Sequence, residues 1–529
     1  MPPASSDPFR VWSRWRSHRP KLAAAALVAC CVIPHAGIAH EATPLLHNDA
    51  TAALFAEILD DIQSYYIDPK QLSELTRVGL DDLGGTGTFS VTEDEETVAF
   101  RHQGQLLSRI PRPADNDSLG WGAVISAGVT AAKSVSPDLN RAAEDTIDET
   151  VVDGMLKQFD RFSRYTTPDP AQAQRDNRDG FGGIGVGIDQ SDTLPRITEV
   201  FPGGPAANAG IAVNDHVLAV DGKLLQGLER DAVVAMLRGP IDSTVDVMVR
   251  RNGSPAPLTF HVTRGLIVPP TVTREDLDQG IVTLRISEFN ADTAASLDAA
   301  LQQTKAGVAG GLRGVIIDLR GNPGGLLAKG GGVDAASLFL DRGEIVSTRG
   351  RNPASMQDFT ADNHDVTGGL PLAILVNGGS ASAAEVMSAA LQDNGRAVVV
   401  GSSSYGKGTV QEVNDLRNGA ELTLTWARLF PPDGYVLHRH GVIPQFCTNI
   451  PGQNIDTIIA KGVHPADPLR ALPRANLDDA QWVSLRQSCP PKTGDNPQDL
   501  SLAKRVLETQ HLYASALAHL TTVARRASD

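Results

Sequence analysis

The sequence predicts a multidomain protein of mixed α/β and β class. An N-terminal helical region, a β-rich domain, an α/β core and a helical C-terminal tail are expected to follow one another. The chain has 529 residues, a length that accommodates two to four domains. Helical spacing of apolar residues dominates before residue 181, short β-like runs follow, and strands alternate with helices from about residue 271. Hydrophobic residues make up 41% and charged residues 21% of the chain, as in soluble globular proteins.

Residues 1–39 are predicted to be an export signal. A basic stretch precedes an apolar run over residues 22–33, and small residues lead to a cleavage point after Ala39. Two alternatives stay open. The run Leu-Val-Ala-Cys that ends at Cys30 resembles a bacterial lipobox, which would lipidate this cysteine and tether the protein to a membrane, and the segment could also remain as an uncleaved anchor. The expected location is the periplasm or cell envelope.

The elements of the first two regions follow from their periodicity. Apolar residues at helical spacing predict helices over residues 49–66 and 147–162, and Gly and Pro clusters divide the part between them into short pieces. Short runs separated by turns then predict a β-rich domain. Its strands are expected at residues 196–200, 216–220 and 245–250, and its helix at residues 230–237.

The α/β core is predicted from apolar runs that alternate with helical segments. The expected strands are residues 281–286, 314–319, 372–376 and 398–400, and the expected helices are residues 293–304, 331–339 and 381–392. The polar tail after about residue 468 is expected to be helical near residues 500–523.

The strand at residues 372–376 ends in a Gly-Gly turn that leads directly into a helix. A hydroxyl at this junction, such as that of Ser382, lies beside unpaired N–H groups and the positive end of the helix dipole, where an oxyanion is stabilised. The N–H of Ala383 is the first candidate donor. The alternative is a helix cap, because Ser382 and Glu385 have the spacing of a capping box.

Lys407 lies between two glycines beside apolar strands. Burial in such a place lowers the pKa of a lysine, so that its amine can take a proton from a serine hydroxyl, and Gln411 is placed to orient that amine. One alternative is a surface lysine in a glycine turn. Another is a phosphate-binding loop, because residues 401–407 nearly match G-x-x-x-x-G-K-[ST]. However, Gly408 replaces the required hydroxyl, and the residues that follow are strand-like.

The strand at residues 314–319 runs into an Asn-Pro-Gly-Gly turn. Backbone without side chains can approach a ligand closely, so Gly324 or Gly325 is the candidate for a second oxyanion donor. Without that role, the same residues are simply a strong turn.

Three motifs together resemble those of the C-terminal processing peptidases, also called tail-specific proteases. They are D-L-R-G-N-P-G-G at residues 318–325, S-A-S-A-A-E at residues 380–385 and Y-G-K-G-T-V-Q at residues 405–411. The resemblance implies that Ser382 is the nucleophile, that Lys407, 25 residues later, is the general base, and that Gln411 positions it. It also implies an α/β core of the ClpP/crotonase-like type. Residues 80–146 and the tail after Cys447 lie outside the resemblance, and Phe162 replaces the family's usual histidine.

The β-rich domain resembles a PDZ domain. The resemblance rests on the glycine-rich run at residues 181–188, with further runs at residues 200–210 and 215–222. The N–H groups of Ile184, Gly185 and Val186 are expected to bind a chain-terminal carboxylate, while the adjacent strand edge accepts a peptide. A domain that only regulates access to the active site is the alternative.

Charge and residue spacing argue against other partners. The net charge of −15 repels phosphate backbones, so no nucleic acid is expected. His438 and His440 have no further ligand at metal-binding spacing and are expected to be exposed, and no cofactor is predicted. Outside the predicted signal, Cys447 and Cys489 are either a disulfide or two unrelated thiols.

The resulting hypothesis is an exported serine endopeptidase that acts on envelope proteins, with C-terminal tails as one substrate class. The alternative is a catalytically silent PDZ scaffold. An activating partner protein and an oligomer are compatible with both. The predicted regions are a signal at residues 1–39, a helical region with an insertion at residues 40–178, a PDZ domain at residues 179–266, a Ser-Lys peptidase core at residues 267–460 and a helical extension at residues 461–529.

Overall fold

The structure is a computed structural model that describes residues 49–84, 88–189, 194–361, 364–461 and 477–527, with side chains to residue 518. The predicted signal at residues 1–39, including the lipidation alternative at Cys30, lies outside the described residues. Within the described ranges, no helix has both the length and the apolar character needed to cross a membrane.

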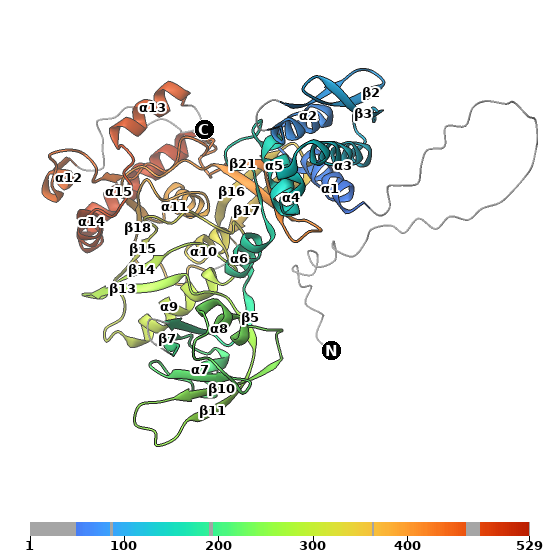
Figure 1. Ribbon diagram of the computed structural model, residues 1–529. Coiled ribbons are helices and arrows are strands. Elements are labelled where there is room, and N and C mark those ends of the chain that lie inside the picture. The colour runs from blue at the N-terminus through green and yellow to red at the C-terminus, as the bar shows by residue number, and fades with distance from the viewer. Residues whose placement is uncertain (1–48, 85–87, 190–193, 362–363, 462–476, 528–529) are drawn as a thin grey trace, which may run out of the picture. The chain divides into compact units, whose positions relative to one another are not determined.

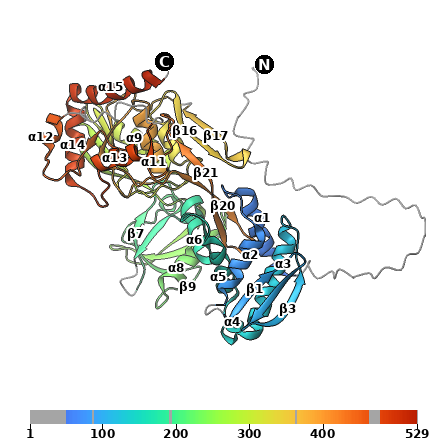
Figure 2. The ribbon, with the colours of Figure 1, turned by 90° about the horizontal axis from the view of Figure 1, so that it is seen from above.

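The N-terminal region packs five helices against a small antiparallel sheet of order β1-β2-β3, as Figure 2 shows. Its helices are α1 (Ala50–Tyr65), α2 (Leu72–Asp82), α3 (Ser118–Val135), α4 (Pro137–Arg141) and α5 (Glu144–Leu156), and its strands are β1 (Phe89–Glu93), β2 (Thr97–His102) and β3 (Gln105–Pro111).

Two predictions for this region were wrong in detail. The stretch between the predicted helices is not a series of short pieces, because it holds this sheet and the 18-residue helix α3. Small residues weaken the amphipathic signal of α3 but allow close packing: a Cβ on Gly122 would lie 2.4 Å from the Ala52 carbonyl oxygen. The helix expected over residues 147–162 ends at Leu156, and a loop carries the remaining residues.

The β-rich region forms a sheet of order β11-β10-β8-β7-β6, with β9 paired to β8. Its helices are α7 (Pro205–Ala209) and α8 (Arg230–Leu237), and its strands are β6 (Val186–Asp189), β7 (Arg196–Val200), β8 (His216–Val220), β9 (Lys223–Leu224), β10 (Thr244–Arg250) and β11 (Leu258–Thr263). The predicted strands and helix are confirmed here. A separate two-stranded ribbon, β5 (Phe181–Gly183) and β12 (Gly265–Ile267), joins the two ends of the region.

The α/β core is a six-stranded sheet of order β13-β14-β15-β18-β19-β22, parallel except for the β13–β14 pair. Helices cover both faces (Figure 1): α9, α10 and α11 pack on one, and α14 and α15 on the other. The strands are β13 (Val272–Asp278), β14 (Ile281–Ile286), β15 (Gly314–Asp318), β18 (Leu372–Val376), β19 (Val398–Gly401) and β22 (Phe446–Cys447), and the helices are α9 (Thr293–Gly307), α10 (Gly332–Ser337) and α11 (Ala383–Asp393). The predicted elements of the core are therefore confirmed.

A second, antiparallel sheet of order β17-β16-β21-β20 lies beside this core and was not predicted as a sheet. Its strands are β16 (Gly343–Gly350), β17 (Gln357–Ala361), β20 (Thr409–Asp415) and β21 (Glu421–Phe430), and β4 (Arg164–Thr166) pairs with β21; a 3-10 turn, η3 (Pro353–Ser355), joins β16 to β17. The helix α6 (Pro168–Asp179) follows β4.

The C-terminal tail is helical near residues 500–523, as predicted, and two helices make up this stretch. Thr509 ends α14 (Pro497–Glu508) in a non-helical conformation before α15 (Gln510–Ala527) begins. The helices α12 (Ile455–Lys461) and α13 (Asp479–Ser488) precede them.

Candidate active site

Ser382 occupies the corner between the buried strand β18 and helix α11. Its backbone has φ 55° and ψ −119°, a conformation that non-glycine residues rarely adopt and that costs on the order of 1–3 kcal/mol. The residues before and after it are buried, and the Ala381 N–H donates to the Asn322 carbonyl at 2.9 Å. The surrounding structure therefore maintains a strained serine at the start of a helix.

Lys407 lies in the loop that joins β19 to β20. Gly406 and Gly408 flank it, and a Cβ on Gly408 would lie 2.0 Å from the His438 nitrogen, so the loop packs too closely for any larger residue. The chain continues into the strand β20 rather than a helix. The phosphate-binding alternative requires a helix at this point, and it is therefore wrong.

A single buried carboxylate joins the loops of the predicted nucleophile and base. The Glu385 side chain is fully buried, and one of its oxygens accepts the backbone N–H of both Ser382 and Lys407, each at 2.8 Å. The other oxygen accepts the Gly406 N–H at 2.7 Å and the Ser404 hydroxyl. The sequence pattern around Glu385 predicts only a helix cap. Its link to Lys407 depends on tertiary structure.

The amine of Lys407 is partly buried beside an aromatic ring. Its Nζ lies 5.1 Å from the centre of the Phe162 ring. Among the described residues Lys407 forms no salt bridge, and Glu385 and Asp160 act on it only through their more distant charge. Burial lowers the pKa of Lys407 below its ordinary value, and the nearby charge of Arg164 lowers it further. Phe162, the residue that departs from the family pattern, therefore contributes to the apolar surroundings of the amine.

The candidate oxyanion donors differ in whether their N–H groups are already hydrogen-bonded. The Gly324 N–H donates to Asn322 Oδ1 at 2.8 Å and is therefore occupied, whereas neither the Gly325 nor the Ala383 N–H has a hydrogen-bond partner in the described ranges. Gly325 has φ 137°, and a Cβ there would lie 2.0 Å from the Phe289 carbonyl oxygen. Of the two glycines predicted for this role, Gly325 is the one with an available donor.

Gln411 lines the same cavity, but the structure does not bond it to Lys407. Its amide donates to the hydroxyls of Thr409 at 2.9 Å and Thr425 at 3.2 Å. Thr425 in turn donates to Asp160 at 3.1 Å. The side chain thus belongs to a network next to the lysine.

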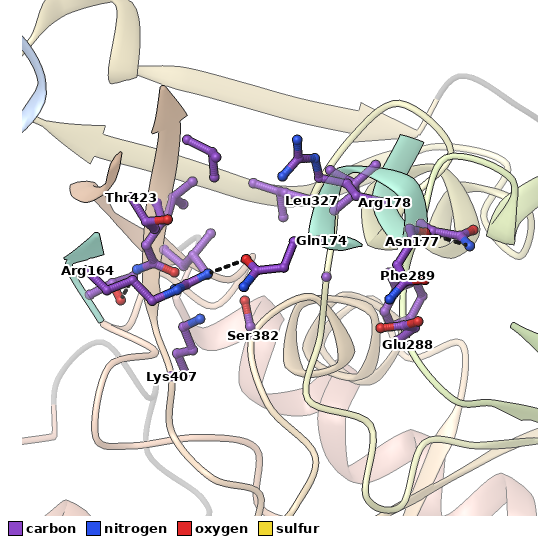
Figure 3. A pocket seen from close by; sticks show the side chains of 18 residues that line it. Arg164, Gln174, Asn177, Arg178, Glu288, Phe289, Leu327, Ser382, Lys407 and Thr423 are labelled. Carbon is purple, nitrogen blue, oxygen red and sulfur yellow. Dashed lines mark hydrogen bonds between the residues drawn. The ribbon is translucent and has the colours of Figure 1, made fainter. Parts of the chain in front are cut away.

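Ser382 and Lys407 point into one cavity of about 370 Å³ (Figure 3). One part of the wall is apolar, with Leu326, Leu327, Val410, Val413 and Leu429. Helix α6 and β4 contribute polar residues that sequence analysis did not find, namely Arg164, Gln174, Asn177 and Arg178. No local pattern marks them, because they precede Ser382 by about 200 residues and reach the site only through the fold.

A second cavity, of about 240 Å³, lies in the β-rich domain and is called the peptide groove below. It follows the edge strand β6 and is lined by the three residues predicted to bind a carboxylate, Ile184, Gly185 and Val186. In the described chain, the N–H groups of Ile184 and Gly185 have no hydrogen-bond acceptor. Since the Phe201 N–H donates to the Gly185 carbonyl, Val186 is in a non-hydrogen-bonded pair and its N–H faces away from β7.

The burial of the two histidines and the pairing of the two cysteines depend on the tertiary structure. His438 and His440 are partly buried, so the expectation of exposure was wrong: the first lies edge-on to Phe162, and the second stacks on Trp482 at 4.4 Å. No group of three metal-binding side chains occurs among the described residues. Cys447 and Cys489 form a disulfide, which resolves the open alternative.

Comparisons with known proteins agree with the motifs. The model of peptidase family S41 matches residues 280–447, and a PDZ domain model matches residues 196–251. The carboxy-terminal-processing protease of Bartonella bacilliformis is 34% identical over 305 residues, which span 57% of this chain and 70% of that protein. A carboxyl-terminal-processing protease of Synechocystis is 34% identical over 303 residues, with 56% and 69% covered. A solved photosystem II D1 C-terminal processing protease is 25% identical, with a TM-score of 0.36, and the match covers 75% of this chain and 92% of that one.

Proposed function

We propose how this chain, which belongs to the carboxy-terminal-processing proteases of peptidase family S41, hydrolyses a peptide bond. Family membership makes it a serine protease with a PDZ domain that acts on proteins or peptides. In our proposal, Ser382 is the nucleophile, Lys407 the general base, and the N–H groups of Ala383 and Gly325 hold the oxyanion.

One observation carries this proposal. A single oxygen of Glu385 accepts the N–H groups of Ser382 and Lys407, so two residues that are distant in sequence lie at one cavity. A lysine amine that is half-buried and without a salt-bridge partner in the described chain is suited to act as a base, because burial lowers its pKa and so reduces the cost of its neutral form.

The reaction follows from these positions. Lys407 takes the hydroxyl proton as Ser382 attacks the substrate carbonyl, and the negative oxygen that forms accepts hydrogen bonds from the two N–H groups. Lys407 then returns the proton to the leaving amine, and an acyl-enzyme remains on Ser382. A water molecule, deprotonated by the same lysine, then attacks the acyl carbonyl. The bond to Ser382 Oγ breaks, Lys407 returns the proton to this oxygen, and the acid product is released. Gln411 is proposed to position Lys407 through the threonine network rather than by a direct bond.

The peptide groove is proposed to bind the C-terminal tail of the substrate. The N–H groups of Ile184, Gly185 and Val186 would hold its carboxylate, and the unpaired edge of β6 would accept its backbone. Ile188, Phe201 and Leu237 give the groove an apolar wall, which favours a tail that ends in an apolar residue. Regulation of access to the active site remains the alternative use of this domain.

The proposed location is outside the cytoplasm, in the periplasm or cell envelope. The basic and apolar stretches of residues 1–39 support it, as does the Cys447–Cys489 disulfide, since disulfides persist mainly in oxidising compartments.

Activity measurements on three variants test the dyad. Hydrolysis of a fluorogenic peptide or an unfolded protein should fall at least about a thousandfold in Ser382→Ala and Lys407→Ala, with folding retained. Ser388→Ala is the matched control, because its hydroxyl bonds within the same helix and does not line the cavity. A serine-directed probe should label only chains that keep Ser382. Full activity in either dyad variant, or binding of peptides without any labelling, would end the proposal and favour a silent scaffold.

A further inference from the structure

The C-terminal segment 482–499 contacts every loop that carries the proposed site. We infer that this segment positions the catalytic loops, and that the Cys447–Cys489 disulfide fixes it against the core. The inference rests on the proposed function, because it assigns the segment a role relative to Ser382 and Lys407. The segment runs from within α13 into the start of α14 and lies beyond the family motifs, which end before Cys447.

The segment bonds the base loop through a row of buried serines. The Ser403 hydroxyl donates to the Cys489 carbonyl at 2.6 Å, and the Lys492 N–H donates to Ser402 Oγ at 3.2 Å. Arg486 donates to the Ser404 carbonyl at 2.9 Å. These serines belong to the stretch that imitates a phosphate-binding loop. In this protein their hydroxyl and carbonyl groups fix the loop that ends in the catalytic lysine.

The same segment bonds the other two loops. Next to the nucleophile, the Gly378 N–H donates to the Lys492 carbonyl at 2.8 Å, and the Asn377 amide donates to the Gly494 carbonyl at 3.2 Å. At the oxyanion turn, Arg320 donates to the Asn496 carbonyl at 3.2 Å. The same arginine pairs with three acids, Asp318 on its own side and Asp495 and Asp499 in the segment.

The disulfide lies at the centre of these contacts. Cys489 ends α13, and its carbonyl is the acceptor for Ser403, while its sulfur is bonded to Cys447 at the end of the core strand β22. Both cysteines are buried. The bond therefore fixes, relative to the core sheet, the residue from which the base loop takes one of its hydrogen bonds.

A role in positioning follows from what the segment does not contact. No residue between 482 and 499 lines the catalytic cavity as the structure describes it, so the segment can act on catalysis only through the loops. Catalytic groups misplaced by about 1 Å can lose on the order of a hundredfold in rate. Loosening the segment should therefore lower kcat and leave substrate binding largely unchanged.

The first experiment removes the disulfide from the full chain. Cys447→Ala/Cys489→Ala should lower kcat about ten- to a hundredfold with little change in KM. Its pH profile should also move to higher pH, because solvent that enters beside a loosened Lys407 raises the pKa of the amine.

Reduction of the wild type should reproduce this loss. Dithiothreitol supplies two electrons and two protons, the disulfide becomes two thiols, and the reagent is released as its cyclic disulfide. Activity should fall in step with the thiols that appear and return on reoxidation. The chain without Cys447 and Cys489 should not respond.

The second experiment keeps the disulfide and removes one hydrogen bond. Ser403→Ala deletes the donor to the Cys489 carbonyl and should lower kcat severalfold at constant KM. The control is Ser488→Ala, because Ser488 donates to the Leu485 carbonyl within α13 and bonds none of the three loops. If the cysteine variant fails to fold, comparing Ser403→Ala with Ser488→Ala still tests whether the segment positions the base loop.

Wild-type kcat in both the cysteine variant and Ser403→Ala would overturn the inference. It would also be overturned if the loss of activity in these variants equalled the fraction of unfolded protein measured in a thermal melt. Failure of the proposed function looks different. In that case Ser382→Ala or Lys407→Ala retains activity, whatever the state of the disulfide.

Discussion

The catalytic cavity and the peptide groove are built in opposite ways. The cavity collects residues from β4, α6, the turn after β15, the start of α11 and the strand β20, which are far apart in sequence. Seven of the 15 residues that line the groove come from one continuous run, residues 181–188, which leads into the edge strand β6. In the cavity, the N–H groups of Ser382 and Lys407 are bonded to a buried Glu385, which fixes their loops around the open donors. In the groove, no comparable side chain bonds the N–H groups of Ile184 and Gly185 in the described chain.

This difference reflects what each site has to do. A hydrolytic site must hold a nucleophile, a base and oxyanion donors in one geometry, so strain at Ser382 and burial at Lys407 are retained by a network of bonds. A peptide-binding edge needs only unpaired N–H groups and an apolar wall, because the ligand itself completes the sheet. The two sites should therefore fail independently when altered.

The largest expected effect comes from a substitution that impairs catalysis in the cavity and leaves the groove intact. In Gly325→Ala the new Cβ cannot fit beside the Phe289 carbonyl, so the turn must shift and move the N–H away from the oxyanion; kcat should fall by about a hundredfold or more, as measured with a fluorogenic peptide. The control is Gly311→Ala, because Gly311 also has positive φ but open space around it. Peptide binding to the groove should be unchanged in both variants, and a normal kcat in Gly325→Ala would exclude this turn from the oxyanion site.

The next effect comes from a substitution that weakens peptide binding to the groove and leaves the cavity intact. Gly185 has φ 75°, and a Cβ there would meet Ile267 at 3.2 Å, so Gly185→Val should distort the carboxylate-binding run and weaken binding of an apolar C-terminal peptide about tenfold. Fluorescence anisotropy in the Ser382→Ala background would measure binding without cleavage. Gly222→Ala, which has positive φ and open space, is the control. An equal loss in hydrolysis of a short peptide would instead indicate that the domain controls access to the active site.

A smaller effect concerns the base. Arg164 lowers the pKa of Lys407, so Arg164→Gln should raise that pKa and shift the rise of kcat/KM to higher pH. The variant should be slower near pH 7 and approach the wild type at alkaline pH. Arg164→Lys keeps the charge and should keep the profile, and added salt should reduce the difference between wild type and Arg164→Gln. An unchanged profile in Arg164→Gln would show that the arginine charge does not reach the amine.

The smallest effect measures what the buried base costs in stability. Because the folded-state pKa of Lys407 is below its ordinary value of 10.5, the unfolded chain binds the proton more tightly. The penalty is full below the folded-state pKa and disappears as pH rises through the ordinary value. Lys407→Met should therefore raise the free energy of unfolding at pH 7 by on the order of 1 kcal/mol, with a smaller gain near pH 10, as measured by denaturant titration. The exposed Lys305→Met should give no gain.

Much of the fold could be predicted because its signals are local. The core strand β18 is a continuous apolar run bounded by turns, and β14 is mainly apolar; the predicted limits of both agree with the structure. The helix α3 was missed because its small residues give little amphipathic contrast, although they pack closely against α1. The second sheet was missed because β16 and β21 pair across about 70 residues of intervening chain, a relation that no local pattern contains.

The chemical groups of the proposed site can be identified from short motifs, because the residue types and spacing around Ser382, Lys407 and the Gly-Gly turn are specific. Only the tertiary structure decided which groups are available: it placed Arg164 beside the base, occupied the Gly324 N–H, and joined Ser382 to Lys407 through Glu385. The reason is physical. Burial, pKa and hydrogen-bond saturation depend on neighbours that the chain brings together only by folding.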